Sequence, residues 1–131
     1  MLRFLPGVVL ALLPLPVIAQ DVNCNTAQTQ MEMTYCAEQE WMAADGYLNA
    51  AYRVARDRMR GIDADLPADM RGAAVQLRDA QRAWVTFRDA NCAAEGYAMR
   101  GGTAEPMVIY YCRARITLAR TADLEMMGQS Y

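Results

Sequence analysis

Small and apolar residues recur every three or four positions in the first long polar stretch of the chain. They occur at Ala37, Trp41, Ala44, Leu48, Ala51 and Ala55. This spacing keeps one face of a helix against a partner. Thr29 and Glu32 form a capping-box motif just before the run, which indicates a helix start. The residues from Gly61 to Pro67 break the pattern, so we predict a first helix over residues 30–60.

Two further stretches repeat the helical spacing. The second has its apolar line at Ala73, Leu77, Ala80, Trp84 and Phe87. The third has its line at Ile109, Cys112, Ile116, Ala119 and Leu124. Proline and glycine are concentrated between the stretches, where Pro67 suits the first turn of a helix. Strand-like alternation never persists for six residues. We therefore predict an all-α bundle of three main helices over about 30–60, 67–96 and 104–127.

The first 19 residues have the layout of a secretory signal peptide. Arg3 supplies the positive start, an apolar run follows over residues 4–18, and Ala19 closes a small-residue exit. The run is short and contains three prolines, and no later segment is long and apolar enough to span a bilayer. We expect a leader at 1–19 and one domain at 20–131, without an integral membrane segment once the leader is removed. The expected location is periplasmic or secreted.

Four cysteines lie in the part of the chain that would be exported, and an even number there indicates disulfides. A disulfide requires Cα atoms roughly 4.4 to 6.8 Å apart. The segment after Cys24 is long enough to fold back onto Cys36 in the first predicted helix. Cys92 and Cys112 lie on the two arms of a predicted helical hairpin. We prefer the pairs Cys24–Cys36 and Cys92–Cys112, and the sequence leaves the other two connectivities open.

Composition argues against several kinds of function. The chain has no histidine and no lysine, its 13 cationic residues are all arginine, and its 15 acidic residues give a net charge of −2. A basic footprint for nucleic acid is absent, and zinc sites with imidazole ligands are impossible. A serine or cysteine nucleophile would lack its usual histidine base. We predict no catalytic residue, no metal, no cofactor and no nucleic-acid partner.

A polar set shares a face with the apolar stripe of the first predicted helix. Asp45, Asn49 and Tyr52 are spaced four and three residues apart, so they lie on one side of a helix. A half-buried carboxylate needs a partner, and we expect Asp45 to pair with Arg88 or Arg120. We predict that the resulting network fixes the helix register. Its expected members are Asp45, Asn49, Tyr52, Trp84, Arg88, Arg120, and Gln81 or Thr117 as the group that completes the hydrogen bonding.

These residues belong to a longer set of motifs that runs in order from Cys24 to Leu124. The motifs are Thr29-Gln30-Met31-Glu32-Met33 with Cys36-Ala37, Asp45-x-x-Leu48-Asn49-x-x-Tyr52, Leu77-x-x-Ala80-Gln81-Arg82-Ala83-Trp84-x-x-Phe87-Arg88-Asp89-x-x-Cys92, Gly101-Gly102, and Cys112-x-x-x-x-Thr117-x-x-Arg120. The combination resembles the LprI-type lysozyme inhibitor family, with a DUF1311-like domain. The resemblance implies a small secreted or lipid-anchored helical domain that inhibits lysozyme. It also implies a framework role for the matching polar positions, and it supplies no inhibitory residue.

Two functions of different classes remain as hypotheses. The first is a binding protein that occludes the active cleft of a c-type lysozyme or other muramidase, which contains two catalytic carboxylates. One candidate contact is the loop of Arg100, Gly101 and Gly102, whose arginine would pair with a carboxylate. The other is an acidic loop with Asp63 and Asp65, which would bind a basic rim. The second function is a non-inhibitory adaptor module of the cell envelope, because a fold does not determine a function.

Overall fold

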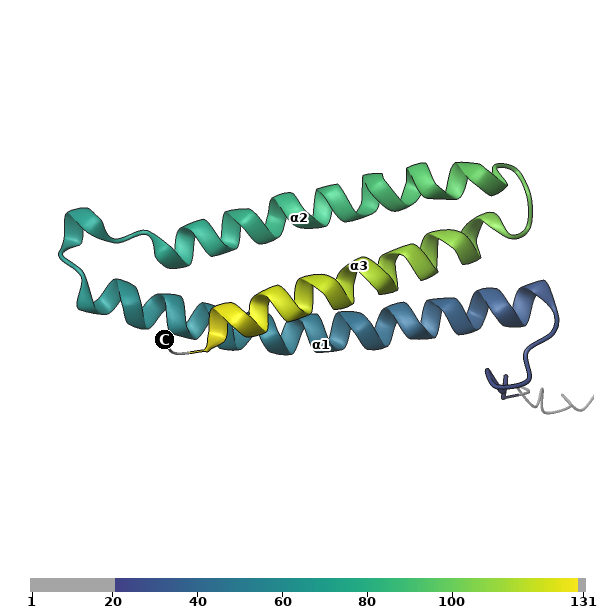
Figure 1. Ribbon diagram of the computed structural model, residues 1–131, viewed down its shortest axis with the longest axis horizontal. Helices are drawn as coiled ribbons and strands as arrows, with labels where there is room; N and C mark the ends of the chain where they lie inside the picture. Colours follow the sequence, from purple (N-terminus) through teal and green to yellow (C-terminus); the bar gives the residue numbers. More distant parts are fainter. Residues whose placement is uncertain (1–20, 130–131) are drawn as a thin grey trace, which may run out of the picture.

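The computed structural model describes residues 21–129, which form a bundle of three long helices (Figure 1). Their order is α1 (Gln30–Asp65), a short 3₁₀ turn η1 (Ala68–Met70), α2 (Ala73–Gly96), a second turn η2 (Tyr97–Met99) and α3 (Glu105–Gly128). No strand occurs in the described residues, and the predicted all-α class is confirmed. The predicted leader at 1–19 lies outside them. Within 21–129, no helix has both the length and the hydropathy to cross a membrane.

α1 begins where the sequence predicts and ends later than predicted. At its start the Thr29 hydroxyl accepts the Glu32 amide at 3.2 Å, and the Glu32 carboxylate accepts the Thr29 amide at 3.0 Å. The helix then passes through Gly61 and ends at Asp65 rather than at residue 60. One glycine costs a helix only about 1 kcal/mol relative to alanine. The helix stops at Leu66, which has the extended backbone that a following proline favours.

α2 begins at Ala73, and our prediction of a start at residue 67 was wrong. The start is fixed by a carboxylate from the preceding helix. Asp63 Oδ1 accepts the backbone amides of Gly72 and Ala73 at 2.8 Å each, and Asp63 Oδ2 accepts that of Ala74 at 3.0 Å. Amides at a helix start have no partner within their own helix. Asp63 therefore caps α2 from the last turn of α1 and determines where α2 begins.

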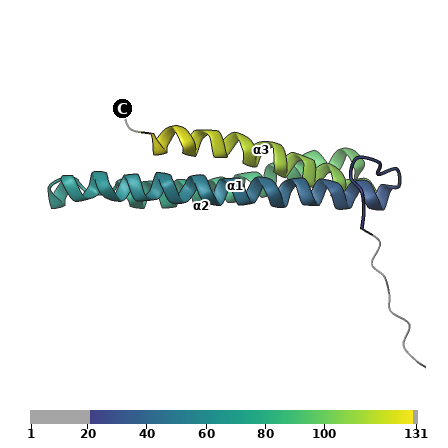
Figure 2. The same cartoon turned by 90° about the horizontal axis from the view of Figure 1, so that it is seen from below.

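The three helices pack around a thin core. α1 and α3 run in the same direction, and α2 runs antiparallel to both (Figure 1). Seen from below, α1 and α2 overlap while the C-terminal half of α3 lies outside their layer (Figure 2). One buried cluster joins the three helices and consists of Leu48, Ala51, Ala55, Leu77 and Leu124. The alanines of α1 bring the helix backbones close together, because they leave little side-chain volume between them.

The apolar line predicted for the second helix is only partly buried. Leu77 is buried and Trp84 is half-buried, but Ala80 and Phe87 are exposed, the phenylalanine to 58%. In α3 the predicted core position Ala119 is exposed as well. With α3 displaced from the layer of α1 and α2, neighbouring helices cover only a narrow stripe of α2. Helical spacing identified the apolar positions of α2, but not which of them would be covered.

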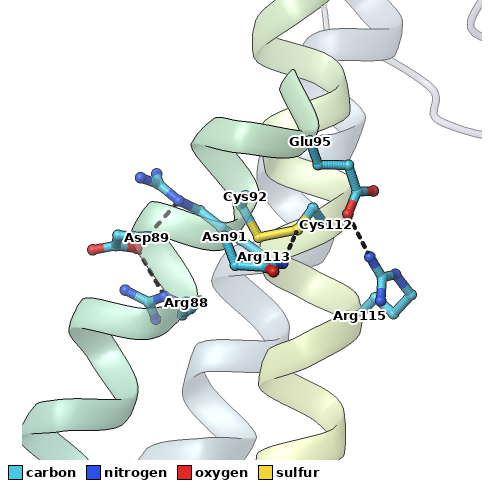
Figure 3. The surroundings of a disulfide bond; sticks show 8 residues. All are labelled: Arg88, Asp89, Asn91, Cys92, Glu95, Cys112, Arg113 and Arg115. Atoms are coloured by element: carbon cyan, nitrogen blue, oxygen red, sulfur yellow. Dashed lines mark hydrogen bonds and ion pairs between the residues drawn. A yellow bond between two sulfur atoms is a disulfide. The ribbon is translucent and has the colours of Figure 1, made fainter. Parts of the chain in front are cut away.

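Two disulfides close the fold, and both are the local pairs that we preferred from the sequence. Cys24–Cys36 ties the segment before α1 to that helix, and Cys92–Cys112 ties α2 to α3 (Figure 3). The Cα atoms are 5.5 Å apart in each pair. The second bridge is buried, whereas Cys24 of the first is exposed. The end of the bundle where α2 turns into α3 is therefore held covalently from within.

Candidate functional site

A buried arginine lies at the centre of the polar residues between α1 and α2. Arg88 of α2 is only 7% exposed, and its guanidinium carbon lies 5.3 Å from the ring centroid of Trp84 and 5.5 Å from that of Trp41. Its Nη1 atom lies 3.5 Å from Asp45 Oδ1, and its Nε donates to Asp89 Oδ1 at 3.0 Å. Of the two partners expected for Asp45, the structure has Arg88. A planar guanidinium can stack on aromatic rings and pair with carboxylates at once.

Trp41 extends this cluster to the third helix. Its ring stacks on Tyr110 of α3 with the centroids 5.7 Å apart, and the Arg113 guanidinium lies 4.8 Å from its centroid. Asp89 is shared, because its Oδ1 atom is also 3.4 Å from Arg113 Nε (Figure 3). Asp89, Tyr110 and Arg113 were not predicted as partners from the sequence. The Arg88-Asp89 dipeptide within the motif is the signal from which Asp89 could have been identified.

Beside the cluster, α1 and α2 form an open groove of about 400 Å³. No residue of α3 lines it. Its lining residues are Asp45, Leu48, Asn49 and Tyr52 from α1 and Arg78, Gln81, Arg82, Val85 and Arg88 from α2. We call it the α1–α2 groove. Asn49 donates to Asp45 Oδ2 at 3.0 Å, yet its side chain is exposed. Residues predicted only as a framework therefore also line a surface that a ligand can reach.

The predicted network is divided into separate groups. Arg120 of α3 donates from Nε to Gln81 Oε1 at 3.2 Å, which links α3 to α2 without Asp45. Thr117 is fully buried, and its hydroxyl has no hydrogen-bond partner in the described residues. Of the two residues expected to complete the hydrogen bonding, Gln81 accepts from Arg120 and the Thr117 hydroxyl has no partner in this part of the chain, so neither bonds to the Asp45 carboxylate. The methyl group and small volume of Thr117 suit its packed position.

The loop between α2 and α3 forms one end of the molecule (Figure 1). Arg100 Nη1 lies 2.7 Å from Glu105 Oε1, and the arginine also lies 4.7 Å from the Tyr97 ring centroid. Glu105 Oε2 accepts the Gly101 amide at 2.8 Å. That amide and the Arg100 guanidinium hold the pKa of Glu105 below its ordinary value. Tyr97, Met99 and Arg100 are exposed, and we call residues 97–102 the α2–α3 tip.

Asp63 and Asp65 do not form the acidic loop that we predicted. Both lie in the last turn of α1, because the helix continues to Asp65. The Asp63 carboxylate accepts three backbone amides of the α2 start, which hold its pKa below the ordinary value. Only Asp65 has an exposed side chain. Contact with a basic partner at this end would therefore depend on Asp65, while Asp63 is already engaged in the fold.

Replacing Asp63 with asparagine is expected to lower the thermal midpoint by about 5 °C near neutral pH. An amide offers one acceptor oxygen where the carboxylate offers two, and it loses the favourable charge at a helix start. Because the pKa of Asp63 is lowered in the fold, its contribution is present above the unfolded value of about 3.9. The contribution is lost as pH falls through the lower folded value. The difference between wild type and variant should shrink accordingly.

Thermal unfolding followed by circular dichroism from about pH 7 to about pH 2 measures both effects. The matched control is Asp65→Asn, because that side chain is exposed and makes no hydrogen bond in the described residues. The control should keep the wild-type midpoint at every pH. If the two variants had equally lowered thermal midpoints, negative charge at the end of α1 would be stabilising in general. The hydrogen bonds of the Asp63 cap would then make no separate contribution.

No group of three or more cysteine or acidic side chains in residues 21–129 is arranged to hold a metal ion. Many polar groups of the described residues form ion pairs, helix caps and aromatic stacks. The α1–α2 groove and the α2–α3 tip both combine exposure with side chains that can form hydrogen bonds or ion pairs. We take these two as candidate binding surfaces.

The chain is similar to known proteins over most of its length. The family model described as "Lysozyme inhibitor LprI" matches residues 22–124. The "Uncharacterized protein R02472" of Rhizobium meliloti (strain 1021) is 40% identical over 113 residues, which cover 84% of this chain and 81% of that protein. The crystal structure of a DUF1311 family protein (PP0307) from Pseudomonas putida KT2440 aligns with a TM-score of 0.66 and 26% identity, covering 83% of this chain and 100% of that one. This chain belongs to the LprI lysozyme inhibitor family.

Proposed function

We propose that the protein is a periplasmic or secreted inhibitor that binds a lysozyme-like muramidase and blocks its active cleft, without being an enzyme itself. The observation that carries the proposal is family membership across residues 22–124. Two disulfides in a chain of this size are in keeping with an oxidising compartment. The net charge of −2 favours association with a cationic enzyme, through a modest gain in the rate of encounter.

The α2–α3 tip is the surface best suited to enter a cleft. It lies at one end of the bundle (Figure 1) and exposes Tyr97, Met99 and Arg100, and tyrosine and arginine are enriched at the centres of protein interfaces. Arg100 is 63% exposed, whereas its partner Glu105 is only 16% exposed and also accepts the Gly101 amide. A guanidinium has five N–H donors, so Arg100 can pair with a catalytic carboxylate of the enzyme from its exposed side while it keeps Glu105. The nearby buried Cys92–Cys112 bridge keeps the tip preorganised.

The two contacts considered from the sequence lie at opposite ends of the molecule (Figure 1). α1 has 36 residues, which at 1.5 Å per residue extend over about 54 Å. Asp65 at the end of α1 and Arg100 at the tip therefore cannot occupy one active cleft together. The engagement of Asp63 in the α2 cap further favours the tip as the blocking element.

Replacing Arg100 with alanine is expected to weaken inhibition by about 10- to 100-fold, as for an interface residue with a large binding contribution. The measurement is a titration of the oxidised protein into a c-type lysozyme that digests peptidoglycan. Arg60→Ala is the matched control, because the two arginine side chains are 64% and 63% exposed and each forms an ion pair, Arg60 with Asp57 and Arg100 with Glu105. Arg60 lies near the other end of α1, so its variant should inhibit like wild type.

Three results would contradict the proposal in different ways. Unchanged inhibition by the Arg100→Ala variant, together with weaker inhibition by an Asp65→Ala variant, would place the contact at the opposite end of the bundle. Equal losses in the Arg100 and Arg60 variants would indicate a nonspecific effect of net charge. Absence of inhibition by the wild-type protein, at concentrations far above those of several muramidases, would remove the inhibitor function itself.

The second candidate is an adaptor module that binds another envelope protein without inhibiting an enzyme. Large apolar side chains that stay exposed favour it, including Tyr47 at 64%, Val54 at 60% and Phe87 at 58%. Exposed apolar surface of this kind often marks protein interfaces. If the titration shows no inhibition, a pull-down from envelope extract with wild type and a Phe87→Ser variant tests this function.

A further inference from the structure

We propose that the α1–α2 groove is a binding site for the free carboxylate of a short peptide that ends in a small apolar residue. The site is separate from the α2–α3 tip, because its lining residues lie in the middle of α1 and α2. It therefore goes beyond the proposed inhibition of a muramidase and stands or fails independently of it.

The groove carries a local excess of positive charge. Three arginines and one aspartate line it, although the whole chain is acidic. The single lining carboxylate, Asp45, is already matched by Arg88 and by a hydrogen bond from Asn49. Arg78 and Arg82 have only Asp79, outside the lining, as a nearby opposing charge, so one positive charge is in excess. An anionic group is the ligand that this arrangement favours.

Both of those arginines are available to a ligand. Arg82 is exposed, and it interacts with the nearby Asp79 through charge, without a hydrogen bond from its guanidinium within residues 21–129. Arg78 pairs at 2.9 Å with the neighbouring Asp79, and both side chains are about half exposed, 48% and 53%. A pair so exposed to solvent is weak. Both guanidinium groups can thus turn to an incoming carboxylate, which arginine binds through two parallel hydrogen bonds.

The remaining lining groups add hydrogen-bond donors and apolar surface. Gln81 uses its carbonyl oxygen to accept from Arg120, which leaves its amide nitrogen as a donor without a partner in the described residues. Tyr52 contributes a hydroxyl from the opposite wall. Leu48, which is buried, and Val85, which is 37% exposed, also line the groove. Donors beside an apolar surface suit a carboxylate that carries a small apolar side chain.

The size of the groove agrees with a small ligand. Its volume of about 400 Å³ lies at the lower end of the roughly 300 to 1,000 Å³ typical of ligand pockets. The groove is open, so a dipeptide should bind with a Kd on the order of 1 mM. In a cell envelope such a carboxylate has two sources. Cell-wall peptides end in D-alanine, and proteins end in an L-residue.

Titration by two-dimensional ¹H–¹⁵N NMR of the oxidised protein tests the site. The probes are D-alanyl-D-alanine, L-alanyl-L-alanine and the amide of each dipeptide, which lacks the free carboxylate. We expect saturable shifts at the backbone amides of the groove with at least one free acid and none with the amides. Arg82→Gln and Arg78→Gln should each weaken binding by roughly tenfold or more. Arg60→Gln, an exposed arginine outside the groove, should bind like wild type.

The pattern across the probes identifies the source of the carboxylate. Preference for the D,D-dipeptide assigns the groove to cell-wall peptides, preference for the L,L-dipeptide assigns it to protein C-termini, and equal binding assigns recognition to the carboxylate alone. Absence of saturable shifts with either free acid would overturn the proposal. The proposal would also be overturned if the dipeptide acid and its amide bound with equal affinity. The same holds if the Arg60 and Arg82 variants lost equal affinity for the acid. Lysozyme inhibition by the Arg82 variant should equal that of wild type, which separates this test from that of the proposed function.

Discussion

Replacing both Cys92 and Cys112 with alanine is expected to lower the free energy of unfolding by about 2 to 5 kcal/mol. The bridge closes a loop across 20 residues, and its sulfur atoms lie where α2 and α3 pack. Both cysteines are essentially inaccessible, at 0% and 1% exposure. The substitutions would therefore release the constraint on the unfolded chain and also leave small packing defects. Urea unfolding followed by circular dichroism measures the loss.

The pair Cys24–Cys36 is the internal control for this prediction. It closes a shorter loop of 12 residues and ties down a segment that precedes α1, with Cys24 exposed. Without this bridge the segment gains freedom in the folded protein as well as in the unfolded one, so the net loss of stability should be smaller. A mild reductant should also open the exposed bridge first. Equal destabilisation by the two double substitutions would contradict this assignment of roles.

Replacing Arg88 with alanine is expected to lower the free energy of unfolding by about 2 to 4 kcal/mol. The guanidinium lies between the rings of Trp41 and Trp84 and is only 7% exposed, so its removal leaves a cavity between α1 and α2. Its partners Asp45 and Asp89 would lose their buried cation. Their side chains are 42% and 43% exposed, so solvent limits that electrostatic loss and the packing defect dominates.

Arg88→Lys separates packing from charge. Lysine keeps the positive charge but lacks the planar group that stacks on both rings, so we expect an intermediate loss of stability. Urea unfolding with tryptophan emission as the signal reports on both rings directly, because Trp41 and Trp84 are the two tryptophans of the chain. Wild-type stability and emission in the lysine variant would mean that charge alone matters at this position. Wild-type stability in the alanine variant would contradict the central role of the guanidinium.

The features that could be predicted from the sequence depend on residues close together in the chain. The capping box at Thr29 involves residues of one turn, and each disulfide joins cysteines of one segment or one hairpin. The family could also be identified from motif order. Helix ends were less predictable, because the start of α2 depends on the Asp63 carboxylate of α1, which accepts backbone amides 9 to 11 residues further along the chain.

The candidate site was predictable as a set of residues and not as a geometry. Helical spacing placed Asp45, Asn49 and Tyr52 on one face, and the structure keeps them on one wall of the groove. The choice of Arg88 of α2 over Arg120 of α3 as the partner of Asp45 depends on how both of these helices are placed against α1. The sharing of Asp89 between Arg88 and Arg113 requires all three helices in place.

The three helices, the residues that share each helix face and the membership in the family follow from the order of residues along the chain. The exposure of Phe87, the open groove lined by the polar motif residues, and the placement of Arg100 and Asp65 at opposite ends depend on how the helices pack together. The two sets of features differ because the interactions behind them differ in range. Spacing along one helix is set by backbone hydrogen bonds between near neighbours, whereas the rotation and offset of packed helices are set by many weak side-chain contacts between distant segments.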